Sequence, residues 1–331
     1  MKKLLIASTA LIATSSVVGA DVVNGVGSST VTLDGYGRFG LVHDEGFSSD
    51  DTRIEQRFRL NVSVLSVTDG GVEFGGRIRF QSDEGNNGGG VAQNSAAEFN
   101  VESGGFRLDV GNTSDVLDSG DVIDYFGNTG VGLTDFGEIS SNFVLPVSGF
   151  GTSDPDDGEV IPTVKARYAV DAFTFAVSYQ ADSRDGVSYE EFQIGVGYQI
   201  SDNLKVGFAY GEVQNVTGVN GLNSNLTDDA EFVAIGLHGS SGAFTYDLLI
   251  ADIDIDGTDN VDTAFGIGLG YDISAATDIR FVVSDNGVDN NDTAYSLGFR
   301  HSLGGGVSLR GGVGEDDGGD TRADLGVRFD F

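Results

Sequence analysis

Apolar and polar residues alternate along almost the whole chain. In FTFAVSYQ, residues 173–180, the apolar side chains of Phe173, Phe175, Val177 and Tyr179 occupy every second position. A strand points successive side chains to opposite faces, so this spacing gathers them on one face. VEFGGRIRFQ and ADLGVRFDF repeat the pattern, and no stretch has a convincing helical period. The sequence therefore predicts an all-β protein.

Sixteen segments of this kind can be counted. They lie near residues 31–42, 53–66, 72–81, 97–102, 106–111, 163–169, 173–180, 190–198, 204–210, 231–238, 244–251, 262–271, 277–284, 293–301, 307–313 and 321–331. Short turns rich in Gly, Ser and Asp alternate with longer, polar loops. Seven short turns and eight long loops give the fifteen connections of a sixteen-stranded antiparallel meander.

Two architectures compete for this pattern. A soluble antiparallel sandwich would also bury one apolar face, but it explains neither the charged opposite faces nor the alternating connection lengths. A transmembrane barrel has an even strand number, an apolar outer face, a polar lumen, and short turns at one end with long loops at the other. Its closed sheet also pairs every backbone group. We therefore predict a 16-stranded antiparallel transmembrane β-barrel.

The first twenty residues have the features of an export signal. Lys2 and Lys3 precede a mainly apolar run, and Ala20 ends a small-residue motif of the kind found before a cleavage point. The apolar run is shorter than the roughly 20 residues of a spanning helix, and no later segment approaches that length. We expect residues 1–20 to be a cleaved signal peptide and residues 21–331 to form one barrel domain in the outer membrane.

Composition narrows the classes of ligand. The chain has 51 Asp and Glu, 18 Lys and Arg, a net charge of -33 and no Cys. Binding to nucleic acid needs clustered cations, and a disulfide or thiolate metal site needs Cys, so none of these is predicted. Asp-rich stretches at 154–157, 252–256 and 315–317 could bind Ca²⁺ loosely, but none matches the twelve-residue calcium loop. We predict no cofactor, with loosely bound Ca²⁺ as the alternative.

Basic residues gather in the first five predicted strands, opposite the apolar positions. They are Arg38, Arg53, Arg57, Arg59, Arg77, Arg79 and Arg107. Arg57 and Arg59 are two residues apart, as are Arg77 and Arg79 on the neighbouring strand. A sixteen-stranded barrel encloses water, so these side chains form a block on one wall of the lumen, which Lys165 and Arg167 can extend.

The longest gap between predicted strands, roughly residues 112–162, interleaves acidic and apolar side chains. Asp115, Asp118, Asp121 and Asp124 recur at intervals of three. The other outer loops are polar, so apolar residues here indicate burial. We expect this loop to fold into the barrel, with its apolar residues against the wall and its acids facing the arginines. A loose outer loop is the alternative, because structureless loops of this length are either functional or disordered.

Three stretches resemble one known family. VTDGGVEFGGRIRF resembles its second hairpin, DVLDSGDVIDYFGNTGVGLTD its inward-folded third loop, and ADLGVRFDF its closing strand. The chain resembles the general porins of the alphaproteobacterial outer membrane, a Rhodobacter-like group of Gram-negative porins that form sixteen-stranded trimers. The resemblance implies a homotrimer in outer-membrane lipid and lipopolysaccharide. It also implies that the barrel-assembly machinery reads the terminal Phe331.

The resemblance further implies a pore constriction between third-loop carboxylates and a basic wall. We carry this onto Asp115, Asp118, Asp121 and Asp124 of the loop, and onto Arg38, Arg57, Arg59, Arg77, Arg79 and Arg107 of the wall. We therefore expect an outer-membrane porin, not an enzyme, that forms a water-filled channel for passive diffusion of small hydrophilic solutes and ions. Acids exceed bases, so we expect a preference for cations.

Two other functions stay open at this point. A channel specific for a sugar or an organic ion should carry aromatic residues along its lumen, where Tyr36 is the clearest candidate and Tyr125 lies on the loop. A barrel hydrolase is less favoured. It would need a base and a nucleophile, and none of His43, His238 and His301 has a serine placed for a triad.

Overall fold

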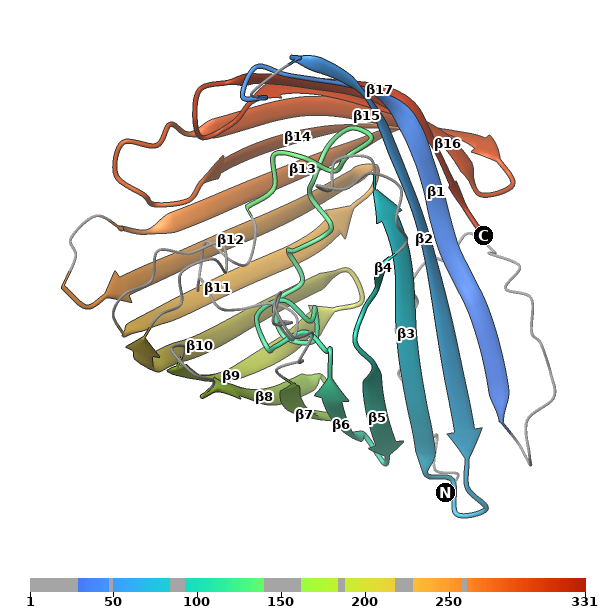
Figure 1. Ribbon diagram of the computed structural model, residues 1–331, viewed down its shortest axis with the longest axis vertical. Coiled ribbons are helices and arrows are strands. Elements are labelled where there is room, and N and C mark those ends of the chain that lie inside the picture. Colours follow the sequence, from blue (N-terminus) through green and yellow to red (C-terminus); the bar gives the residue numbers. More distant parts are fainter. Residues whose placement is uncertain are drawn as a thin grey trace.

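The described part of the protein is one antiparallel sheet that closes on itself (Figure 1). This computed structural model describes residues 29–47, 50–83, 93–139, 162–183, 188–217, 229–257 and 261–331. The expected signal peptide, residues 1–20, lies outside these ranges. No helix in the described ranges is long and apolar enough to cross a membrane.

Seventeen strands fill sixteen positions in the sheet. They are β1 (Thr30–Asp44), β2 (Thr52–Val67), β3 (Glu73–Asp83), β4 (Gln93–Asn94), β5 (Glu98–Ser103), β6 (Phe106–Gly111), β7 (Thr163–Val170), β8 (Phe173–Asp182), β9 (Ser188–Ser201), β10 (Leu204–Thr217), β11 (Ala230–Ser241), β12 (Phe244–Ile255), β13 (Ala264–Ser274), β14 (Thr277–Asp285), β15 (Ala294–Gly304), β16 (Val307–Glu315) and β17 (Thr321–Asp330). The short β4 and β5 both pair with β3 and share one position. The predicted sixteen-stranded barrel is confirmed.

The barrel closes where the first and last strands meet. On β1, Tyr36 lies opposite Arg59 of β2 on one side and opposite Asp330 of β17 on the other. The backbones of Gly35 and Phe331 add two hydrogen bonds at this seam, with N–O distances of 2.8 and 3.0 Å. Pairing between β1 and β17 removes the free edges of an open sheet, as a bilayer requires.

The two faces of the sheet differ as the alternation predicts. On β8, Phe173 and Phe175 are 44% and 47% exposed, whereas Ser178 and Gln180 at the intervening parity are each 3% exposed. An exposed face of phenylalanines is unfavourable in water and favourable against acyl chains. The apolar positions therefore form the outside of the barrel and the polar positions line its interior.

Strand ends at the long loops extend further than the sequence pattern indicates. The alternation predicts an end at Tyr210, yet β10 continues to Thr217. The extension pairs with β9, where Thr217 lies opposite Ser188. Its residues EVQNVT carry little apolar alternation. Backbone pairing therefore continues where the apolar face no longer requires it.

Candidate functional site

Residues 112–139, hereafter the third loop, lie against inward-facing residues of distant strands (Figure 1, green). The backbone N–H of Val116 donates to Ser178 Oγ of β8 at 3.2 Å, and that of Leu117 donates to Gln193 Oε1 of β9 at 2.9 Å. Seven apolar loop side chains have no exposed surface: Val116, Leu117, Val122, Ile123, Tyr125, Val131 and Leu133. The apolar residues of the loop are therefore packed against the wall.

Glycines at inward-facing strand positions make room for the loop. A Cβ on Gly236 of β11 would lie 2.5 Å from Cγ2 of Ile123, and a Cβ on Gly326 of β17 would lie 2.5 Å from Cδ2 of Leu133. Such distances are too short for real carbon contacts. The same reasoning applies at Gly207, Gly266, Gly268 and Gly298, each of which faces a residue of the third loop at under 3.0 Å. Close backbone approach explains glycine within these strands, and the loop follows the wall from β10 to β17.

The start of the third loop is held by cationic side chains. Asp121 accepts hydrogen bonds from Lys165 Nζ at 2.6 Å and from Arg167 Nη1 at 3.0 Å, both on β7. Lys205 Nζ of β10 donates to the carbonyl of Gly120 at 2.6 Å. Burial alone would raise the pKa of Asp121, but the two β7 cations outweigh it and hold that pKa below its usual value.

The other predicted loop acids take part in turns of the loop itself. Asp115 is 2% exposed, and its Oδ1 accepts the backbone N–H of Asp118 at 2.9 Å. Asp124 Oδ1 accepts a hydrogen bond from Asn128 Nδ2 at 2.7 Å. These carboxylates shape the loop, whereas Asp121 also ties it to the basic wall.

The far end of the loop is anchored by the last strand. Asp324 of β17 accepts the backbone N–H groups of Leu133 and Thr134, each at 2.8 Å, and the Thr134 hydroxyl at 2.7 Å. The alternation in ADLGVRFD places Asp324 inward but gives no sign of its partner. This anchor was not predicted from the sequence, because nothing in the local pattern links residues almost two hundred positions apart.

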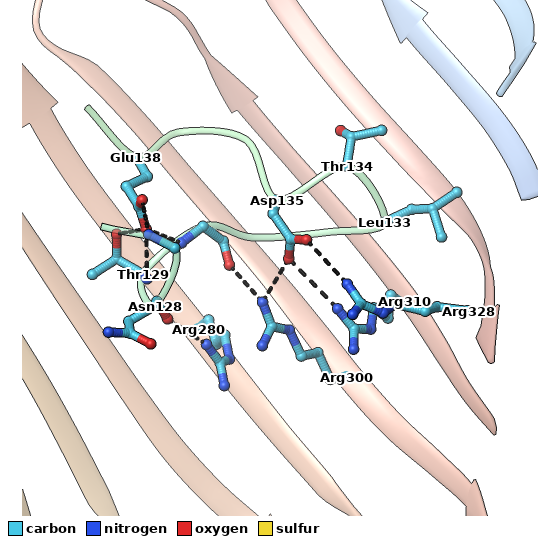
Figure 2. Close-up of polar contacts among 12 residues, drawn as sticks. Asn128, Thr129, Leu133, Thr134, Asp135, Glu138, Arg280, Arg300, Arg310 and Arg328 are labelled. Carbon is cyan, nitrogen blue, oxygen red and sulfur yellow. Dashed lines mark hydrogen bonds and ion pairs between the residues drawn. The ribbon is translucent and has the colours of Figure 1, made fainter. Parts of the chain in front are cut away.

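Asp135 faces three arginines from three strands (Figure 2). Its carboxylate lies 2.7 Å from Arg300 Nη2, 3.5 Å from Arg310 Nη1 and 3.7 Å from Arg328 Nη1. Arg280 on β14 donates to the carbonyl of Asn128 at 2.8 Å. None of these arginines was predicted as a site residue, although their strand parity places them inward.

Glu138 closes a turn of the third loop (Figure 2). Its Oε2 accepts from Thr129 N at 2.7 Å, from Thr129 Oγ1 at 2.6 Å and from Gly130 N at 3.2 Å. Burial raises the pKa of Glu138 even against these donors, because burial disfavours the charged form. The carboxylate therefore stabilises the turn that presents Asp135.

The predicted basic wall is paired mainly with its own neighbouring strands. Arg38 is 7% exposed and lies 2.7 Å from Glu55 on β2. The remaining pairs within the wall join Arg57 to Asp83, Arg77 to Glu98, and Arg107 to Asp109, Glu102 and Glu98. The other two arginines donate hydrogen bonds to side-chain amides, Arg59 to Gln81 and Arg79 to Asn61. Within the described residues, no hydrogen bond or ion pair joins Arg57, Arg59 or Arg77 to the third loop.

Closure of the sheet joins two basic clusters into one. Arg300 lies directly opposite Arg310, and Arg38 lies opposite Arg328 on one side and Arg57 on the other. We call the combined set the arginine arc; it comprises Arg280, Arg300, Arg310, Arg328, Arg38, Arg57, Arg59, Arg77 and Arg79. It runs from β14 through the seam to β3. Only its amino-terminal half was predicted from the sequence.

Comparison with known proteins identifies the family. The family profile described as Gram-negative porin matches residues 7–321. A porin from Fuscovulum blasticum is 31% identical over 334 residues, covering 91% of this chain and all of the relative. The chain belongs to the Gram-negative porin family. A porin from Rhodobacter capsulatus is 27% identical, with the same coverage of both chains.

Solved structures agree with this assignment. A five-substitution mutant of Rh. blastica porin superimposes on this porin with a TM-score of 0.69 at 27% identity, covering 91% of this chain and all of that one. A structure described as showing asymmetric conductivity of engineered proteins gives the same TM-score, identity and coverage. The family resemblance drawn from the sequence is confirmed, and the outer membrane is the location that the family implies.

Proposed function

We propose that this porin forms a water-filled channel for passive diffusion of small hydrophilic solutes and ions across the outer membrane. The observation that carries the proposal is that the third loop and the arginines on β2 and β3 lie apart inside the barrel. The third loop contacts the wall from β7 through β17 to Arg38 of β1, whose Nη1 donates to the carbonyl of Leu133 at 3.4 Å. In contrast, Arg57, Arg59 and Arg77 on β2 and β3 make no contact with it by hydrogen bond or ion pair within the described residues. These side chains line a wall that the loop does not cover.

We assign the constriction to the space between the loop and this wall. The acidic side comprises Asp118, Asp121 and Asp124, to which we add Asp135, and the basic side comprises Arg57, Arg59, Arg77, Arg79 and Arg107. Asp115 and Arg38 are 2% and 7% exposed, so they support the two sides without lining the space. Opposed charges create a transverse field in which polar solutes align. Apolar solutes must break the ordered water, so the channel selects hydrophilic molecules.

Current through single channels tests the proposal directly. Purified porin in planar bilayers should give discrete conductance steps in KCl, and proteoliposomes should swell in isotonic solutions of small sugars at rates that fall with sugar size. Absence of steps in KCl would overturn the assignment as a channel. Swelling with one sugar and not with others of equal size would favour a substrate-specific channel instead.

A hydrolase finds less support in the histidines. His43 Nδ1 lies 2.9 Å from Thr52 Oγ1, and His301 Nδ1 lies 2.8 Å from Thr277 Oγ1. His238 pairs with Asp247 at 2.6 Å. Over the described ranges no serine hydroxyl hydrogen-bonds any of the three histidines, and a triad needs one histidine between a nucleophile and a carboxylate.

The oligomeric state, the lipid partners and the removal of the signal peptide are proposed from the family. We propose a homotrimer in outer-membrane lipid and lipopolysaccharide, made from a precursor whose residues 1–20 are removed. Phe331 stacks on Phe58 at 5.5 Å between ring centroids, which places an aromatic ring at the end of the seam. We propose that the barrel-assembly machinery reads this residue. Removing Phe331 should then reduce the amount of folded barrel in outer membranes.

Bound Ca²⁺ stays a prediction. Residues 154–157 lie outside the described ranges. Elsewhere in the described chain, no three His, Cys, Asp or Glu side chains are grouped so that they could hold a metal ion.

A further inference from the structure

Tyr36 is an inward-facing aromatic ring surrounded by arginines. The guanidinium carbon of Arg328 lies 3.9 Å from the ring centroid, and that of Arg59 lies 5.2 Å from it. Arg57 Nη1 lies 3.4 Å from the tyrosine hydroxyl. Stacking on an aromatic face fixes a guanidinium plane and leaves its N–H edge free for other partners. The ring therefore organises three cations from β2 and β17.

Arg59 differs from its neighbours in its partners. Arg57 is paired with Asp83, and Arg328 lies 2.8 Å from Asp330. Arg59 donates from Nε to the neutral Gln81 at 2.5 Å and forms no ion pair with any described residue. Its side chain is partly exposed within the lumen. A solute in the lumen can therefore reach a stacked guanidinium that is bound to an amide and not to a carboxylate.

We propose that Arg59, together with Tyr36 and Arg328, forms a binding subsite for oxyanion groups, with phosphate and small phosphorylated solutes as its ligands. A planar guanidinium fork matches the geometry of phosphate oxygens, and hydrogen bonds between ions are the strongest of their kind. The subsite rests on the proposed channel function, because its ligand must enter the lumen. It is local: the summed charge of the lumen sets ion preference, whereas the subsite sets how long an oxyanion stays.

Inorganic phosphate is the first probe. Added to a single channel conducting in KCl, it should reduce the mean current with a saturable dependence on concentration, while acetate at equal ionic strength should not. Glucose 6-phosphate should act as phosphate does, and glucose should have no saturable effect. An unsaturated fall that acetate reproduces would overturn the subsite while leaving the channel function intact. Absence of any KCl conductance would instead overturn the channel function.

Two variants of equal charge locate the effect. Arg59→Gln should raise the half-blocking phosphate concentration about tenfold, the loss expected for a charged hydrogen bond. Arg53→Gln is the matched control, since Arg53 lies six residues from Arg59 on the same strand, opposite Val42 of β1, with its guanidinium carbon 3.9 Å from the Phe47 ring centroid. It removes the same charge and should leave the half-blocking concentration within about twofold. Equal shifts in both variants would show a general charge effect and overturn the subsite.

Arg59→Lys separates geometry from charge. Lysine keeps the cation but loses the planar fork and the stacking on Tyr36. The half-blocking phosphate concentration of Arg59→Lys should be close to that of Arg59→Gln. A value equal to that of wild type would show that any cation suffices and would overturn the role given to the planar guanidinium. Isothermal titration of phosphate into the detergent-solubilised porin gives the same comparison without a current, and a binding constant unchanged in Arg59→Gln would contradict the proposal.

Discussion

Asp135 concentrates conformational strain and charge in a single residue. It adopts φ 56, a left-handed conformation that costs most non-glycine residues free energy, of order 1–3 kcal/mol. Its carboxylate meets Arg300, Arg310 and Arg328 on three adjacent strands. Such a conformation persists only where the surroundings determine it, and three guanidinium groups do so here.

Replacing this carboxylate should change ion preference. Asp135→Asn tolerates the left-handed conformation but removes the negative charge, so three arginines lose their common counterion. The reversal potential in a KCl gradient should shift toward anions. Asp69→Asn, which removes the same charge at a tight turn, should give a much smaller shift. No difference between the two variants would contradict the part assigned to Asp135.

The ion pairs of Asp121 predict how the loop responds to acid. Because the β7 cations lower the pKa of Asp121 in the folded protein, its stabilising effect is complete above the ordinary aspartate range, near pH 4. It is lost as the pH falls below that range. The difference in unfolding temperature between wild type and Asp121→Asn should thus be constant from pH 7 to about 5 and shrink below about 4. A difference that shrinks already near pH 6 would rule out this account.

At the scale of elements, glycines in the strands leave room for the atoms of the third loop. Gly207 on β10 faces the backbone carbonyl of Val122, so a methyl group there cannot be accommodated by a side-chain rotation. Gly207→Ala should displace the loop or the strand at a cost of about 1–3 kcal/mol. A lower unfolding temperature in detergent and noisier open-channel current would show this.

A turn glycine provides the comparison. Gly70 lies between β2 and β3, and a Cβ placed there would meet only the Thr68 hydroxyl oxygen, at 4.0 Å. Gly70→Ala should leave unfolding temperature and current noise near wild-type values. If both alanine variants behaved alike, the fit between loop and wall would not depend on glycine.

The strands were predictable from sequence and the loop contacts were not. A period of two residues acts locally, so each strand except the two-residue β4 can be recognised within about ten residues. The anchors join Asp121 to Lys165 on the next strand and Leu133 to Asp324 on the last strand, and neither partner can be identified from the local pattern. The apolar residues of the loop signalled burial, but no local pattern could show which acid meets which arginine.

At the scale of the whole molecule, the excess of acid over base should govern ion flow. The net charge of -33 makes the protein's field negative despite the arginine arc. We expect potassium to be more permeant than chloride, with a preference that weakens as salt concentration rises, because salt screens charge. Reversal potentials in KCl gradients at low and high salt measure both effects, and a reversal potential of the anion-selective sign would contradict the expectation.

The full extent of the arginine arc cannot be predicted from single strands. Arg38 belongs to the start of the chain and Arg328 to its end, yet they lie opposite each other across the seam. Each half was visible as inward-facing basic residues in separate strands. Their union depends on the ring being closed, which is a property of the whole sheet.

Because Asp324 on β17 accepts the N–H groups of Leu133 and Thr134, these hydrogen bonds form only after the last strand of the barrel has joined the sheet. The third loop therefore gains its final contacts late in assembly. If the proposed constriction depends on them, the pore should reach its final width only after the barrel closes.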